Sequence, residues 1–144
     1  MTPDVNVLVA AFRPDHPCHS AARIWLTQAR AACAAGQDSL RLLPMVLAGF
    51  LRLVTNPKVF AEPDPVEDAL RFAHVLLATP GVELASCGEE WPLLREKVRA
   101  RSLTGNKIPD AWIAACVEHF DEHLVTFDRG FRQLLHVKAY TLLT

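Results

Sequence analysis

The sequence predicts a three-layer α/β fold in which a mainly parallel sheet is flanked by helices. Stretches with apolar residues at helical spacing alternate along the chain with short runs typical of strands. Such alternation favours parallel strands joined by helical crossovers. With 144 residues, 51% of them hydrophobic, the chain is long enough to bury a core of its own. No internal repeat or linker interrupts it, so we expect one domain over residues 1–144.

The first predicted strand is very short and runs from Thr2 to Asp4 or Val5. Pro3 has no N–H to donate, so it suits a strand only where the missing donor falls at the end of a ladder. The stretch Val5–Phe12 is ambiguous by its pattern alone. Its β-branched residues favour a strand, whereas the spacing of its apolar residues also permits a helix.

The other elements follow from apolar spacing and from the residues that begin and end helices. Gly36 ends the first long helix, and Asn56-Pro57 ends the next. Asp64 is a predicted N-cap, with Pro65 at the first helical position. We expect helices at Ser20–Ala35, Met45–Val54, Pro65–Ala78, Cys87–Ala100 and Lys107–His119, a short helix at Gly130–Leu135, and strands at Ser39–Leu43, Val82–Ala85, His123–Phe127 and Lys138–Leu142.

The composition limits the class of function. The formal net charge is −1, which gives no global electrostatic case for nucleic-acid binding, although a local basic patch is compatible with it. The four cysteines, at 18, 33, 87 and 116, include no Cys-x-x-Cys pair and match no zinc template, so we expect reduced thiols, with Cys116 in the core. No apolar run is long enough to span a membrane and no signal peptide is apparent, so we expect a cytoplasmic protein.

Three aspartates occupy positions where the acids of an α/β fold can meet. Asp4 and Asp128 each follow a predicted strand, and Asp110 lies in the first turn of a helix with an apolar stripe. In open α/β folds, functional groups gather outside the carboxyl ends of the strands. Three adjacent carboxylates repel one another unless a cation intervenes, and Mg²⁺ or Mn²⁺ prefers such ligands. Each aspartate also has a plain structural explanation, as a turn residue, a helix cap or an exposed terminal residue.

Four segments, in the same order along the chain, resemble motifs of PIN-domain ribonucleases of the VapC toxin type. Pro3–Val9 resembles the opening of these proteins, and Phe50–Phe60 is similar to a segment typical of one branch of the family. Gly105–Ala111 resembles the stretch that leads to the family's third acid, and Leu124–Phe131 resembles its final acidic motif. Because the matches span most of the chain, together they point to a PIN-like domain.

The resemblance implies an endoribonuclease that uses Mg²⁺ or Mn²⁺ and acts as the toxin of a type II toxin–antitoxin pair. It also implies a small VapB-like antitoxin as partner, RNA as substrate and a homodimer. By position, Asp4, Asp110 and Asp128 match the catalytic, metal-binding acids of the family. Asn6 and Thr126 each lie two residues from one of these acids, where a side-chain hydrogen bond can orient a carboxylate.

Basic and aromatic residues near these motifs are the candidates for contacts with RNA. Arg129 adjoins Asp128 and Arg13 follows the first motif, so both are expected to contact substrate phosphates. Lys97 is more consistent with a solvated helix face. Trp112 could stack on an exposed RNA base, but packing in the core is its expected role.

Two features depart from the family pattern. Gly49 stands directly before Phe50, where many members have a glutamate, so the usual four-acid site is incomplete. Only three residues precede Asp4, where the family has a fuller strand; the resemblance ends this strand near Asp4 and begins a helix at Val7–Phe12.

Two alternatives to RNA cleavage remain. The main one is a degenerate, non-catalytic PIN-like module that binds RNA or protein. A weaker one is a phosphatase-type aspartate site on a similar scaffold, which would need a second acid close to Asp4, and none is present.

Overall fold

The computed structural model describes residues 1–144 and confirms a mixed α/β fold with parallel strands. In one ladder β4 lies between β1 and β5, and in the other β2 pairs with β3. The strands are β1 (Thr2–Pro3), β2 (Leu40–Leu42), β3 (Val82–Leu84), β4 (Leu124–Thr126) and β5 (Tyr140–Leu142). The helices are α1 (Val5–Phe12), α2 (His19–Ala34), α3 (Pro44–Val54), α4 (Val66–Leu77), α5 (Trp91–Arg101) and α6 (Lys107–His119), with 3₁₀ turns η1 (Arg129–Gln133) and η2 (Val137–Ala139). None of the helices is both long and apolar enough to cross a membrane.

Pro3 lies where its missing N–H is least costly. The N–H groups of Thr2 and Asp4 donate to carbonyls on the β4 side, at 2.8 and 2.9 Å, so the nitrogen of Pro3 faces β2 instead. On that side the hydroxyl of Thr2 donates to the carbonyl of Arg41, and the N–H of Arg41 donates to the carbonyl of Met1 at 2.8 Å. These bonds join the two ladders, so the strands lie in the order β3-β2-β1-β4-β5.

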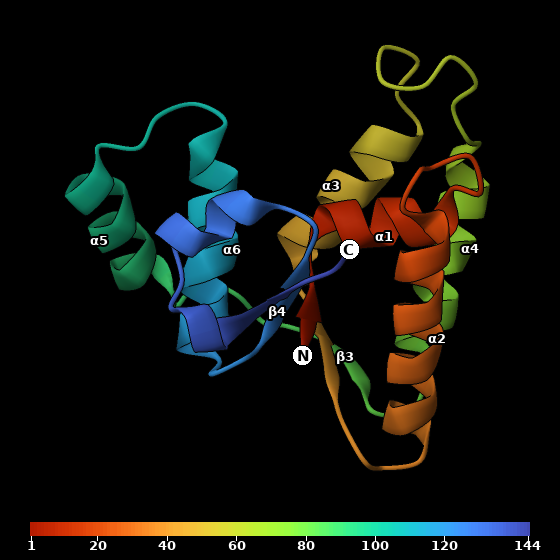
Figure 1. Ribbon diagram of the computed structural model, residues 1–144, viewed down its shortest axis with the longest axis horizontal. Coiled ribbons are helices and arrows are strands. Elements are labelled where there is room, and N and C mark those ends of the chain that lie inside the picture. Colours follow the sequence, from red (N-terminus) through yellow and green to blue (C-terminus); the bar gives the residue numbers. More distant parts are fainter.

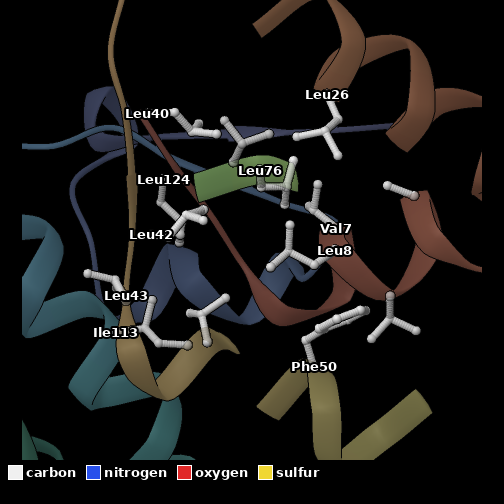
Figure 2. Close-up of a cluster of buried hydrophobic side chains, with 14 of the residues drawn as sticks. Val7, Leu8, Leu26, Leu40, Leu42, Leu43, Phe50, Leu76, Ile113 and Leu124 are labelled. Atoms are coloured by element: carbon white, nitrogen blue, oxygen red, sulfur yellow. The ribbon is translucent and has the colours of Figure 1, made fainter. Parts of the chain in front are cut away.

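Helices pack on both sides of the strands, with α5 and α6 on one side and α1, α2 and α4 on the other (Figure 1). Helix α1 is buried on nearly every face, since its residues 7–11 are each at most 8% exposed. A helix that is apolar on every face belongs in an interior. This burial explains why α1 is helical in spite of its β-branched residues. Its Val7 and Leu8 gather with Phe50 and Leu124 in the core (Figure 2).

Most element boundaries agree with the prediction to within two residues, but the start of α5 does not. This helix begins at Trp91 instead of Cys87, because Gly88 adopts a φ of +136°, which a helix does not allow. Lys97 of this helix is not solvated as expected. Its Nζ donates to Glu118 at 2.6 Å and thereby ties α5 to α6.

Candidate active site

The three predicted acids line one cavity of about 1020 Å³. Asp4 follows β1, Asp128 follows β4, and Asp110 lies in the first turn of α6. Helix α3 contributes Gly49 and Arg52 to the lining of the same cavity. Parallel pairing of β1 with β4 brings their carboxyl ends together, so acids from both ends of the chain reach the same cavity.

Asp4 is held by hydrogen bonds to both of its carboxylate oxygens. The N–H of Val5 donates to Oδ1 at 2.7 Å, and the Asn6 amide and the Thr126 hydroxyl donate to Oδ2 at 2.8 and 2.6 Å. The bond to Val5 makes Asp4 the N-cap of α1. One residue therefore begins the buried helix and presents an oriented carboxylate to the cavity.

Burial and mutual repulsion raise the pKa of two of the acids. Asp4 is 5% exposed, and this burial raises its pKa to about 6, with smaller contributions from the charges of Asp110 and Asp128. Burial, and then the charge of Asp128, raises the pKa of Asp110 above its ordinary value. None of the three forms an ion pair with a lysine, arginine or histidine. A bound cation would relieve this repulsion.

The donor set fits a hard divalent cation, since Mg²⁺ and Mn²⁺ bind carboxylate oxygens. The three aspartates are nevertheless not gathered as tightly as one ion requires, because their oxygens do not all lie within 4.8 Å of one another. Asp128 also caps η1, with its Oδ1 accepting from the N–H of Gly130 at 2.6 Å. Simultaneous contact of all three carboxylates with one ion therefore requires side-chain rotation.

Arg13 has a structural role, contrary to the expected contact with substrate. It is only 7% exposed, and its guanidinium donates to both oxygens of Asp15, to Asp64 at 2.7 Å and to the carbonyl of Glu62. The same group lies 3.9 Å from the centre of the Phe60 ring. Helix α4 begins at Val66, with Pro65 at the N-cap position and no side-chain cap, so the predicted Asp64 cap is wrong.

Two residues that were not expected at the cavity line it. Arg52 is exposed and lies one helical turn after Gly49, and this spacing is the signal that could have identified it. Trp112, expected in the core, is 38% exposed, and its indole N–H donates to Glu90 at 2.6 Å. Arg129 is exposed and does not line the cavity.

Gly49 lines the cavity on α3, where many family members would present an acid. A Cβ added at this position would lie 3.0 Å from Cγ2 and 3.4 Å from Cγ1 of Val5. A larger side chain at Gly49 therefore requires Val5 to move. Since Val5 follows Asp4 directly, this close contact couples α3 to the start of α1.

Comparison with known proteins agrees with this architecture. Residues 1–135 match the family model described as the PIN domain. Ribonuclease VapC25 of Mycobacterium tuberculosis is 36% identical over 136 residues, which cover 94% of this chain and 93% of that protein. VapC ribonuclease Mb2897 of Mycobacterium bovis is also 36% identical over 136 residues, covering 94% and 90%.

Two solved structures share the fold. VapBC2 from Rickettsia felis, bound to a DNA fragment from its promoter, gives a TM-score of 0.66 at 18% identity and covers 99% of this chain and 98% of its own. VapC20 of Mycobacterium tuberculosis, a Sarcin-Ricin loop cleaving toxin, gives a TM-score of 0.64 at 18% identity, with 95% and 96% covered. The chain therefore belongs to the PIN-domain family and, within it, to the group of VapC ribonucleases.

Proposed function

We propose that the chain is a metal-dependent endoribonuclease that cleaves RNA phosphodiester bonds. The proposal depends chiefly on the convergence of Asp4, Asp110 and Asp128 on one cavity, where none of them forms an ion pair with a basic side chain. Relatives at 36% identity are named ribonucleases, which favours catalysis on RNA over a non-catalytic module or a phosphatase-type site.

Asp4 and Asp110 are the proposed principal ligands for Mg²⁺ or Mn²⁺, and Asp128 completes the set. The ion would supply positive charge at the scissile phosphate and lower the pKa of an attacking water. Asn6 and Thr126 act through Asp4: their two hydrogen bonds fix one of its oxygens before any ion arrives. This arrangement reduces the reorganisation that binding requires.

The proposed contacts with RNA come from exposed side chains. Arg52 projects from the cavity lining, and Arg129 adjoins Asp128 in an exposed turn, so both are placed to meet phosphate oxygens without reading the base sequence. The partly exposed ring of Trp112 offers a surface on which a base can stack.

The proposed setting is that of a toxin in the cytoplasm, held inactive by a small VapB-like antitoxin. Support comes from the relatives named VapC and from a structural neighbour that is a VapBC complex. We also propose a homodimer, as the family resemblance implies. Sedimentation equilibrium tests this point, since a dimer has twice the 16.0 kDa mass of the chain.

Cleavage of a defined RNA panel, with Mg²⁺ or Mn²⁺ and with EDTA, tests the activity. We expect wild-type cleavage to need the metal and Asp110→Asn to lose it, since the substitution removes a ligand charge while keeping the shape. Asp121→Asn is the matched control, because Asp121 is exposed and its φ of 52° is tolerated by asparagine. RNA binding without cleavage under every condition would instead favour the non-catalytic module, for which Gly49 is the structural argument.

A further inference from the structure

Away from the cavity, three side chains with metal-binding chemistry meet where the turn before α5 packs on α6. The Sγ atoms of Cys87 and Cys116 lie 3.9 Å apart, and an oxygen of Glu90 completes a set of ligand atoms that all lie within 4.8 Å of one another. No other three His, Cys, Asp or Glu side chains of the chain are gathered so closely. Two thiolates bound to tetrahedral Zn²⁺ at roughly 2.3 Å lie about 3.8 Å apart, so the observed sulfur spacing fits one ion.

Glu90 is a buried carboxylate without a cationic partner. It is 2% exposed and forms no ion pair. Although burial opposes ionisation, hydrogen bonds from the Trp112 indole and the Gly88 N–H, both at 2.6 Å, hold its pKa below the ordinary value. An ionised group in an interior needs a countercharge, and no side chain supplies one here.

The two thiols complement this charge. Cys116 is fully buried on α6, whereas Cys87 is half-buried in the turn, so the cluster is reachable from one side. Burial raises the pKa of both thiols, and the charge of Glu90 adds to this effect. A cation at this position would offset both the burial and the repulsion, and its binding would release the thiol protons to solvent.

We propose that Cys87, Glu90 and Cys116 bind a zinc ion, at a site separate from the three aspartates. Two thiolates and a carboxylate suit Zn²⁺, whereas an all-oxygen set suits Mg²⁺ or Mn²⁺. Three protein ligands leave the fourth position to solvent. Gly88 makes the turn between the first two ligands, and Trp112 orients Glu90 from outside the ligand set.

The position of this site gives it a structural consequence. Helices α5 and α6 lie side by side at one flank of the molecule (Figure 1), and α6 carries both Asp110 and Trp112 of the cavity lining. Zinc would link the turn before α5 to Cys116, near the C-terminal end of α6. It would therefore stabilise the helix that positions one of the proposed nuclease ligands, without itself entering the cavity.

Titration of the reduced, metal-free chain with Co²⁺ tests the zinc site. Cobalt bound to thiolates gives a charge-transfer absorption, and cobalt bound only to carboxylates does not, so the signal reports on cysteine ligands and not on the three aspartates. We expect the band to saturate at one ion per chain and to disappear when Zn²⁺ displaces cobalt. Cys87→Ser should abolish the band, whereas Cys18→Ser, a matched change at another half-buried cysteine, and Asp110→Asn should preserve it.

Two further measurements sharpen the result. Trp112→Phe removes the hydrogen bond to Glu90 and should weaken zinc affinity by about 10- to 100-fold. Zinc should raise the melting temperature of the wild type and of Cys18→Ser by more than that of Cys87→Ser, in which only the three aspartates remain to bind it. The absence of a thiolate band in the wild type, its persistence in Cys87→Ser, or a Cys87–Cys116 disulfide that excludes cobalt would overturn the proposal.

Discussion

Replacing Asp4 by asparagine should stabilise the metal-free chain at neutral pH, although it removes a proposed ligand. In the wild type this buried group has its pKa raised from 3.8 to about 6. A shift of that size corresponds to about 3 kcal/mol of unfolding free energy lost once the group is ionised in the folded state. Asparagine removes the charge, but it places an NH₂ group where Oδ2 of Asp4 accepts hydrogen bonds from Thr126 and Asn6. The loss of these bonds lowers the unfolding free energy by about 1–2 kcal/mol. The expected net gain is therefore about 1–2 kcal/mol above pH 6.

The pH dependence of this difference identifies its cause. Because the folded-state pKa of Asp4 is the higher one, the folded chain binds more protons between pH 3.8 and about 6. The unfolding free energy of the wild type should thus fall as pH rises through this window. Asp4→Asn should not show the decrease that the ionisation of Asp4 causes. Near pH 4, where Asp4 is protonated in the folded state, the wild type should be the more stable of the two. The sign of the difference should reverse within the window.

Urea unfolding in EDTA, followed by circular dichroism at several pH values, measures the effect. Asp121→Asn corrects for the loss of a carboxylate at an exposed position. Mn²⁺ should then raise the melting temperature of the wild type and of Asp121→Asn more than that of Asp4→Asn. A stability difference between Asp4→Asn and wild type that stays constant from pH 4 to pH 7 would refute the argument from buried charge.

Three other substitutions test the remaining assignments. Gly49→Glu should bind Mn²⁺ more tightly than Gly49→Ala in calorimetry, because both crowd Val5 but only the glutamate adds a ligand; equal affinities would mean that position 49 does not face the ion. Arg13→Gln should lower the melting temperature by several degrees, since it breaks a largely buried ion-pair cluster, and should leave RNA affinity unchanged; weaker RNA binding by the folded variant would restore Arg13 to the substrate surface. Arg52→Ala should weaken RNA binding and reduce the slope of log K against log[salt] by the amount expected for about one phosphate contact. An unchanged slope would show that Arg52 does not contact RNA phosphate.

The order of the elements could be predicted from the sequence because it depends on local patterns. Apolar spacing and terminating residues place most helices, and strand runs alternate with them. The start of α5 could not be predicted in this way, since an apolar pattern does not show that Gly88 adopts a positive φ. The Val5–Phe12 stretch was ambiguous for a related reason: its helical state depends on the Asp4 cap and on burial from every side, which are tertiary effects.

The candidate site was only partly predictable. That acids after parallel strands meet at one edge is a general rule of α/β folds, and it correctly groups Asp4 with Asp128. Roles that depend on a side chain's partners could not be foreseen. Arg13 and Arg52 have the same chemistry, but Arg13 forms ion pairs with Asp15 and Asp64, whereas Arg52 lines the cavity without an ion-pair partner.

The register between the short strands β1 and β4 determines where the Thr126 hydroxyl lies relative to the acids. Pairing of β1 with β4 sets Thr126 beside Asp4, and the Thr126 hydroxyl donates its single proton to Asp4. The same oxygen accepts from the Asn6 amide at 3.2 Å and from the Asp128 N–H at 2.9 Å. A slip of one residue would turn Thr126 to the other face of the strand and separate these groups. Only two residue pairs align β1 with β4, so the strand pairing alone defines the register weakly. The buried hydrogen bonds around Thr126 form only in this register and therefore help to stabilise it.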